Sequence, residues 1–248
     1  MARLFGVNAV SYYLPQVSRV IAFTRCLRDW YIQREICRDD SIDLVPIYQR
    51  AAPFVSATAA PTRVGFIAKD FKAKGGVTLL DAFKRVRLVR PDAELWIVGC
   101  PKQLDEGELR ERGINWFSYV PRQTILTEIL PVIDVLAYPT QFDGLPLVVL
   151  EAMSFGIAIA TSDYMAMPEI VDDGNAGMIS AVGNSEMLAD HILKLLQPET
   201  NIHYRLAARR RFENYYSKEA VLPKLMECYM KAIVAYVNKS NLEPALVS

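Results

Sequence analysis

The chain has 248 residues, of which 52% are hydrophobic and 23% charged, so it can bury a large core and is not a disordered chain. Lys plus Arg and Asp plus Glu both number 28, which gives a formal net charge of zero. A general polyanion binder normally has a basic excess, so we expect no nucleic-acid partner and only a local anion site.

The four cysteines form no C-x-x-C pair, which argues against a zinc site or a disulfide framework and favours reduced thiols. Residues 1–16 contain one Arg and no clean apolar core, and make a poor signal peptide. No uncharged apolar run approaches the ~20 residues needed to span a bilayer. We therefore predict a cytoplasmic protein without a transmembrane segment, and peripheral membrane contact stays open.

Residues 1–62 have the pattern of a partial N-terminal segment that ends in a linker. An apolar run at 20–23 predicts a strand, and Thr24 is suited to cap a following helix. A second short strand is expected over 43–48, where Pro46 favours an edge position or a strand end. Residues 51–62 are small, polar and proline-bearing, and we expect the linker there.

From residue 63 onward, short apolar runs alternate with helical patterns, which predicts parallel βαβ units. We expect strands over 64–68, 93–98, 116–120, 132–138 and 157–160, and helices over 77–90, 103–111, 123–130 and 145–154. The fold class is therefore α/β, with a Rossmann-like, doubly wound parallel sheet over 63–200 and C-terminal helices over 201–248. Helices are expected over 185–196, 205–216 and 220–237.

Ligands of such sheets bind at the carboxyl ends of the strands, here loops 69–76, 99–104, 119–122, 139–146 and 161–168. The first loop holds Lys69, Lys72 and Lys74 before Gly75 and Gly76. Lysines at a glycine-rich helix start suit a phosphate, although a solvated turn would have the same composition. Neither G-x-x-x-x-G-K-[ST] nor G-x-G-x-x-G occurs in the chain.

The loop after the fourth strand carries Asp143, and Glu151 follows eight residues later inside an apolar helix. A carboxylate among apolar residues needs a partner or a cleft. The two side chains could accept hydrogen bonds from ligand hydroxyls at one pocket. Alternatively, Glu151 pairs with a structural Arg or lies at the surface, and Asp143 only caps the helix.

Two stretches together resemble the C-terminal, donor-binding half of the retaining GT-B glycosyltransferases. They are VGFIAKDFKAKGGVTLLDAFKRVRLVRPDAELWIVG and VIDVLAYPTQFDGLPLVVLEAMSFGIAIATSDYMAMPEIVDDGNAG. The resemblance covers about residues 63–217, with a weaker likeness over 18–50 to the end of the family's N-terminal half. It implies hexosyl transfer with retention from a UDP-, GDP- or ADP-sugar, without a cofactor or a metal.

The resemblance also implies roles for individual residues. Lys69 and Lys74 match the basic pair that neutralises the donor diphosphate. Asp143 matches the acidic position near the sugar hydroxyls, and Glu151 matches the position that binds the ribose. The implied catalytic set is Lys69, Lys74 and Asp143, and the implied donor-binding set is Gly75, Val120, Gly144, Leu145, Leu147, Val148 and Glu151.

The sequence departs from the family pattern at three site positions and in length. Asp143 replaces the usual Glu, Lys69 replaces Arg and loses its bidentate fork, and Pro146 has no N–H. About 62 residues precede the donor half, too few for a full acceptor domain. The alternative is therefore a non-catalytic or split half that binds a nucleotide-sugar or a partner chain, and the acceptor stays unknown. A flavodoxin-like or receiver module would leave the basic loop and the acidic pair unexplained.

Overall fold

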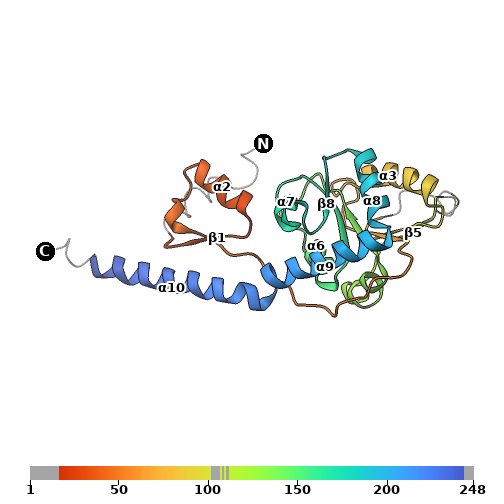
Figure 1. The fold of residues 1–248 in the computed structure, drawn as a ribbon. Coiled ribbons are helices and arrows are strands. Elements are labelled where there is room, and N and C mark those ends of the chain that lie inside the picture. The colour runs from red at the N-terminus through yellow and green to blue at the C-terminus, as the bar shows by residue number, and fades with distance from the viewer. Residues whose placement is uncertain (1–16, 102–106, 108, 110–111, 243–248) are drawn as a thin grey trace. The chain divides into compact units, whose positions relative to one another are not determined.

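The computed structural model describes residues 17–101, 107, 109 and 112–242, and the chain packs as two compact units (Figure 1). The larger unit comprises residues 49–214, and the smaller one the described residues of 1–48 and 215–248. The helix expected over 103–111 lies outside the described residues except for 107 and 109, which are helical. Residues 1–16 also lie outside them.

The larger unit is built on a parallel six-stranded sheet in the order β5-β4-β3-β6-β7-β8. The strands are β3 (Arg63–Ile67), β4 (Glu94–Val98), β5 (Ile114–Phe117), β6 (Val135–Tyr138), β7 (Ala158–Ser162) and β8 (Met178–Ser180). The chain winds from β3 to one edge and then returns to β6 and winds to the other. The point where the winding reverses therefore lies between β3 and β6, which is where such sheets bind ligands.

Helices cover both faces of this sheet. They are α3 (Gly76–Val89), α5 (Arg122–Thr124), the π-helical η4 (Ile125–Ile129), η5 (Leu130–Val132), α6 (Leu147–Phe155), α7 (Met167–Ile170), η6 (Asp172–Gly174), α8 (Ser185–Leu195) and α9 (Pro198–Tyr215). α3 and α8 pack together over one face (Figure 1), and their apolar residues share a core with β3 and β4. α6 packs on β6 and β7, and right-handed crossovers in opposite directions place it on the other face from α3. The expected doubly wound α/β fold is confirmed.

Several boundaries differ from those expected. β5 begins at Ile114, directly after Gly113, because residues 114–117 pair with β4. β6 begins only at Val135. Val132 belongs to η5, and the Asp134 carboxylate accepts hydrogen bonds from the backbone N–H groups of Thr62 and Arg63. α6 begins at Leu147, because Pro146 occupies its N-cap position. The short elements α7 and β8 were not predicted.

The expected linker lies along the larger unit as an extended segment. The Val55 N–H donates to the carbonyl of Phe155 (3.0 Å), and Arg205 donates to the Val55 carbonyl (2.7 Å). At its end, the Thr62 and Arg63 N–H groups donate to the buried Asp134 carboxylate at 2.8 and 2.9 Å. These contacts fix where β3 begins. Domain boundaries at residues 62 and 200 stay predictions.

The smaller unit contains β1 (Val20–Ala22), α2 (Arg25–Gln33), η3 (Asp39–Ser41), β2 (Ile42–Leu44) and α10 (Lys218–Leu242). β1 and β2 pair in parallel. Thr24 caps α2 as expected, since its hydroxyl accepts from the Leu27 N–H (3.3 Å). Val221 and Cys228 of α10 pack with Val45, which follows β2.

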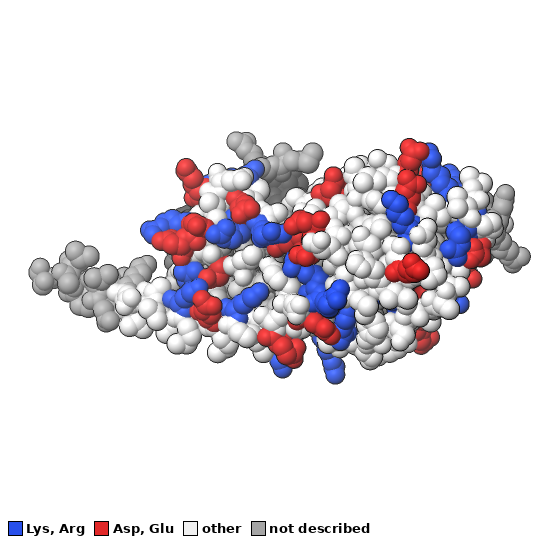
Figure 2. Space-filling model, in the orientation of Figure 1, with Lys and Arg blue, Asp and Glu red and all other residues white. Residues whose placement is uncertain are grey.

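On the face shown in Figure 2, Lys and Arg side chains are interspersed with Asp and Glu. In the part of the chain that the structure describes, no helix has the length and apolar character to cross a bilayer.

Candidate functional site

A cavity of about 550 Å³ opens at the carboxyl ends of the central strands of the larger unit. Four of the five loops expected at a ligand site contribute to its wall. The lining residues are Ile67, Ala68, Lys69, Val98, Gly99, Tyr119, Val120, Arg122, Ile125, Tyr138, Asp143, Leu145, Pro146, Leu147, Val148 and Glu151. The cavity therefore lies at the reversal point between β3 and β6, and we call it the strand-end cavity.

The basic loop 69–76 is bound tightly to the loop that follows β6. Gly75 has φ = 83° and precedes α3, and a Cβ built on it would lie 1.9 Å from the Pro139 carbonyl oxygen. The carbonyl of Ala73 accepts from the N–H groups of Gln141 (3.0 Å) and Phe142 (3.1 Å). The glycine thus permits the close approach that brings the lysine loop to the acidic loop.

Asp143 is the centre of a hydrogen-bonded cluster. Its carboxylate accepts from the Tyr138 hydroxyl (2.7 Å) and the Leu145 N–H (3.2 Å), and it pairs with the Lys74 ammonium (2.8 Å). Lys74 also donates to the Phe142 carbonyl (2.6 Å). Burial, and the hydrogen bond to Asp143, raise the pKa of Tyr138 above its usual range. The carboxylate thus holds Lys74 in place instead of capping α6.

The first turn of α6 faces the strand-end cavity. This nine-residue helix has no side-chain cap at its N-terminus, and Leu147 and Val148 line the cavity. The N–H groups of a first helical turn have no partner within the helix and carry a partial positive charge. The exposed Lys69 lines the same cavity. This end of the cavity is suited to a phosphate or diphosphate.

Glu151 lies farther along α6, and its side chain is 10% exposed. Its carboxylate forms a hydrogen bond and an ion pair with Arg122, whose side chain is 63% exposed. Burial raises the pKa of Glu151, and the charge and hydrogen bond of Arg122 act against this rise. The sequence left two alternatives for Glu151, a ligand-facing carboxylate or a partner of a structural Arg. In the structure Glu151 pairs with Arg122 and also lines the cavity.

The structure brings most of the expected site residues to one cavity. Lys74 and Gly75 support the site through the contacts described above, and Gly144 lies in open space beside Asp143. Sequence reasoning gave no role to Tyr119, Arg122 or Tyr138, which also line the cavity. Tyr119 and Arg122 lie in an expected ligand loop, and Tyr138 ends an expected strand, so position alone could have indicated them.

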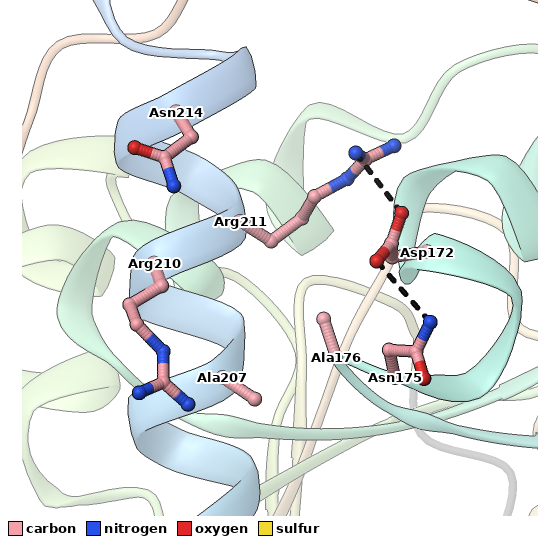
Figure 3. A pocket seen from close by; sticks show the side chains of 7 residues that line it. All are labelled: Asp172, Asn175, Ala176, Ala207, Arg210, Arg211 and Asn214. Atoms are coloured by element: carbon pink, nitrogen blue, oxygen red, sulfur yellow. Dashed lines mark hydrogen bonds and ion pairs between the residues drawn. The ribbon is translucent and has the colours of Figure 1, made fainter.

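A separate hollow of about 310 Å³ lies between α9 and residues 172–176 (Figure 3). There Arg211 reaches across to Asp172 (3.1 Å), and the Asn175 amide donates to the same carboxylate (3.3 Å). Arg211 also donates to the Glu169 carbonyl (2.8 Å). These groups bind one another, and the hollow contains none of the expected donor residues, so the strand-end cavity is the candidate site.

Among the described residues, no three His, Cys, Asp or Glu side chains gather as metal ligands would. All four cysteines are free, and Cys37, Cys100 and Cys228 are buried. The polar groups that line the strand-end cavity are those of Lys69, Arg122, Asp143, Glu151, Tyr119 and Tyr138, together with the N-terminus of α6.

The sequence profile of glycosyl transferases group 1 matches residues 61–198, more than half of the chain. O-antigen chain mannosyltransferase B of Escherichia coli is 33% identical over 98 residues, 40% of this chain and 25% of that protein. Alpha-maltose-1-phosphate synthase of Mycobacterium tuberculosis is 28% identical over 188 residues, 67% of this chain and 47% of that protein. The chain thus spans half or less of the length of these relatives.

Solved structures share the fold at low sequence identity. Anabaena HepE, crystallised with UDP and glucose, matches with a TM-score of 0.72 at 15% identity, over 93% of this chain and 68% of that one. Sucrose-phosphate synthase from Thermosynechococcus elongatus matches with a TM-score of 0.72 at 17% identity, over 91% of this chain and 61% of that one.

Proposed function

The chain belongs to the glycosyl transferases group 1, and from this premise we propose that it binds a nucleotide-activated sugar in the strand-end cavity and transfers the sugar with retention of configuration. The observation that carries the proposal is one cavity lined by Lys69, Asp143, Glu151 and the first turn of α6, with Lys74 paired to Asp143. The retaining outcome rests on the resemblance described above.

Lys69, Lys74 and the first turn of α6 would hold the donor diphosphate. In the transfer, the bond between the sugar C1 and the diphosphate oxygen breaks, the bond from C1 to the acceptor oxygen forms, and the acceptor hydroxyl proton leaves with the nucleoside diphosphate. Negative charge grows on the departing nucleoside diphosphate, and fixed cations and N–H dipoles stabilise that charge. We propose that these groups supply the stabilisation without a metal.

The two carboxylates would orient the rest of the donor. Glu151 would accept hydrogen bonds from ribose hydroxyls, since it is a buried acceptor that lines the cavity. Asp143 would lie near the sugar hydroxyls and would hold Lys74 through their 2.8 Å ion pair. Its side chain is one methylene shorter than the family's usual Glu, and the hydrogen bond from Tyr138 fixes its position.

Calorimetry with UDP, GDP, ADP and their sugar conjugates tests donor binding. We expect heat from at least one of them and a loss of about tenfold or more in affinity for Lys74→Ala, because a hydrogen bond to a charged group is removed. Lys84→Ala is the matched control, since Lys84 pairs with Asp81 on α3, whereas Lys74 pairs with Asp143, which lines the cavity. Folded wild-type protein that gives no heat with any of these ligands would contradict the proposal.

A second candidate is a donor-binding half that turns over only with a further half. An apolar stripe on α10 favours it, with residues at i, i+3, i+4, i+7, i+8 and i+11 that are 48% to 57% exposed: Met226, Tyr229, Met230, Ile233, Val234 and Val237. Such a face on a helix indicates a partner surface. Nucleotide binding without release of sugar from the donor would support this candidate, and turnover by the chain alone would contradict it.

A further inference from the structure

Arg122 and Glu151 lie between two neighbouring hollows. Both line the strand-end cavity, and both also line a second hollow of about 580 Å³. The other residues of the second hollow are Gln49, Arg50, Ala51, Ala52, Pro53, Gln123, Leu126, Ser154 and Phe155. The pair therefore borders both hollows, and the exposed Arg122 side chain also contacts solvent.

The surroundings of Glu151 disfavour its charged form. The residue as a whole is 8% exposed, and every other residue of α6 is uncharged. A buried carboxylate tends to take up a proton, and a protonated carboxyl has lost part of its capacity to accept hydrogen bonds. The titratable and charged groups that line the same two hollows are Arg50, Lys69, Tyr119, Arg122, Tyr138 and Asp143.

Among these groups, Arg122 is the one in direct contact with the Glu151 carboxylate. The contact joins Nη2 of Arg122 to Oε1 of Glu151. A carboxylate has about four acceptor positions on its two oxygens, so a pair at one oxygen leaves positions for ligand hydroxyls. A guanidinium keeps its charge at every pH at which the protein is folded.

We propose that Arg122 is a positioning residue that keeps the Glu151 carboxylate ionised and oriented toward the strand-end cavity. The inference rests on the proposed function only where it names the ligand, which is the ribose of a nucleoside diphosphate. Arg122 follows Pro121 at the start of α5, and from this position its guanidinium contacts the Glu151 carboxylate.

Carbon-13 NMR of the Glu side-chain carboxyls tests this inference without any ligand, with Glu151→Gln identifying the resonance. In Arg122→Gln we expect the titration midpoint of Glu151 to rise by about one unit, because a charge partner lowers a carboxyl pKa by roughly one to three units and Arg122 is partly exposed. Arg122→Lys should restore most of the wild-type midpoint. Arg85→Gln, which breaks an ion pair with Glu186 on the surface, should leave the midpoint unchanged.

Calorimetric titration with UDP supplies the second readout. We expect the affinity of Arg122→Gln at neutral pH to lie below that of wild type, and to fall further relative to wild type as pH is lowered through the raised Glu151 midpoint of the variant. A Glu151 midpoint that is the same in wild type and Arg122→Gln would overturn the inference. Absence of UDP binding at every pH, together with a shifted midpoint, would contradict uridine-nucleotide binding and leave the role of Arg122 supported.

Discussion

For Glu151, the sequence predicts the need for a partner or a cleft but does not identify the partner. A carboxylate inside the apolar run of α6 indicates a partner or a cleft, and the structure has both. Arg122 could not be predicted as its partner, because the two residues lie 29 positions apart in the sequence with β6 between them. Tyr138 lies only five residues from Asp143, and the fold of the loop between them brings its hydroxyl to the Asp143 carboxylate.

The raised pKa of Glu151 predicts a pH-dependent stability difference. A carboxyl whose folded pKa is raised adds stability below its unfolded value, near 4.5, and this contribution is lost as pH rises through the folded pKa. The free energy of unfolding of wild type should therefore fall, relative to that of Glu151→Gln, as pH rises from about 4 to 7. Urea unfolding of both proteins across this range measures the difference. A difference that stays constant with pH, or that changes in the opposite direction, would show that burial does not raise this pKa.

At the scale of elements, the apolar runs predict most strands and helices of the larger unit, because strands covered on both faces are nearly continuous apolar segments. Short or irregular elements could not be predicted from apolar runs. β8 has three residues, and the helical segment after β5 passes from α5 through the π-helical η4 into η5, which contains Pro131. These elements are set by tertiary contacts and by backbone geometry rather than by periodicity.

The contact between the basic loop and the acidic loop depends on Gly75. We expect Gly75→Ala to lower the free energy of unfolding by about 2 kcal/mol or more, because left-handed backbone is unfavourable for alanine and the added Cβ meets Pro139. Urea unfolding measures this loss. The control is Gly144→Ala, where an added Cβ has no atom within 4 Å and the change should stay within about 0.5 kcal/mol. Equal stability of the two variants would mean that the loops do not need this close approach.

At the scale of the whole molecule, the sequence predicts a doubly wound parallel sheet, but the strand order comes from the structure. That order places β3 beside β6 and so brings the loops at 69–76 and 139–146 together. The association of residues 215–242 with 17–48 in one unit is also a long-range packing result that local patterns do not encode. The strand order and the association of the two terminal segments both depend on tertiary packing between elements that are distant in the sequence.

The central claim is that a nucleoside diphosphate binds in the strand-end cavity. A crystal structure of the chain with the nucleotide that binds in calorimetry tests it most directly. We predict that the diphosphate lies against Lys69, Lys74 and the first turn of α6, with the ribose hydroxyls on Glu151. A nucleotide found instead in the hollow beside Arg211, or on any surface away from β3 and β6, would contradict the account.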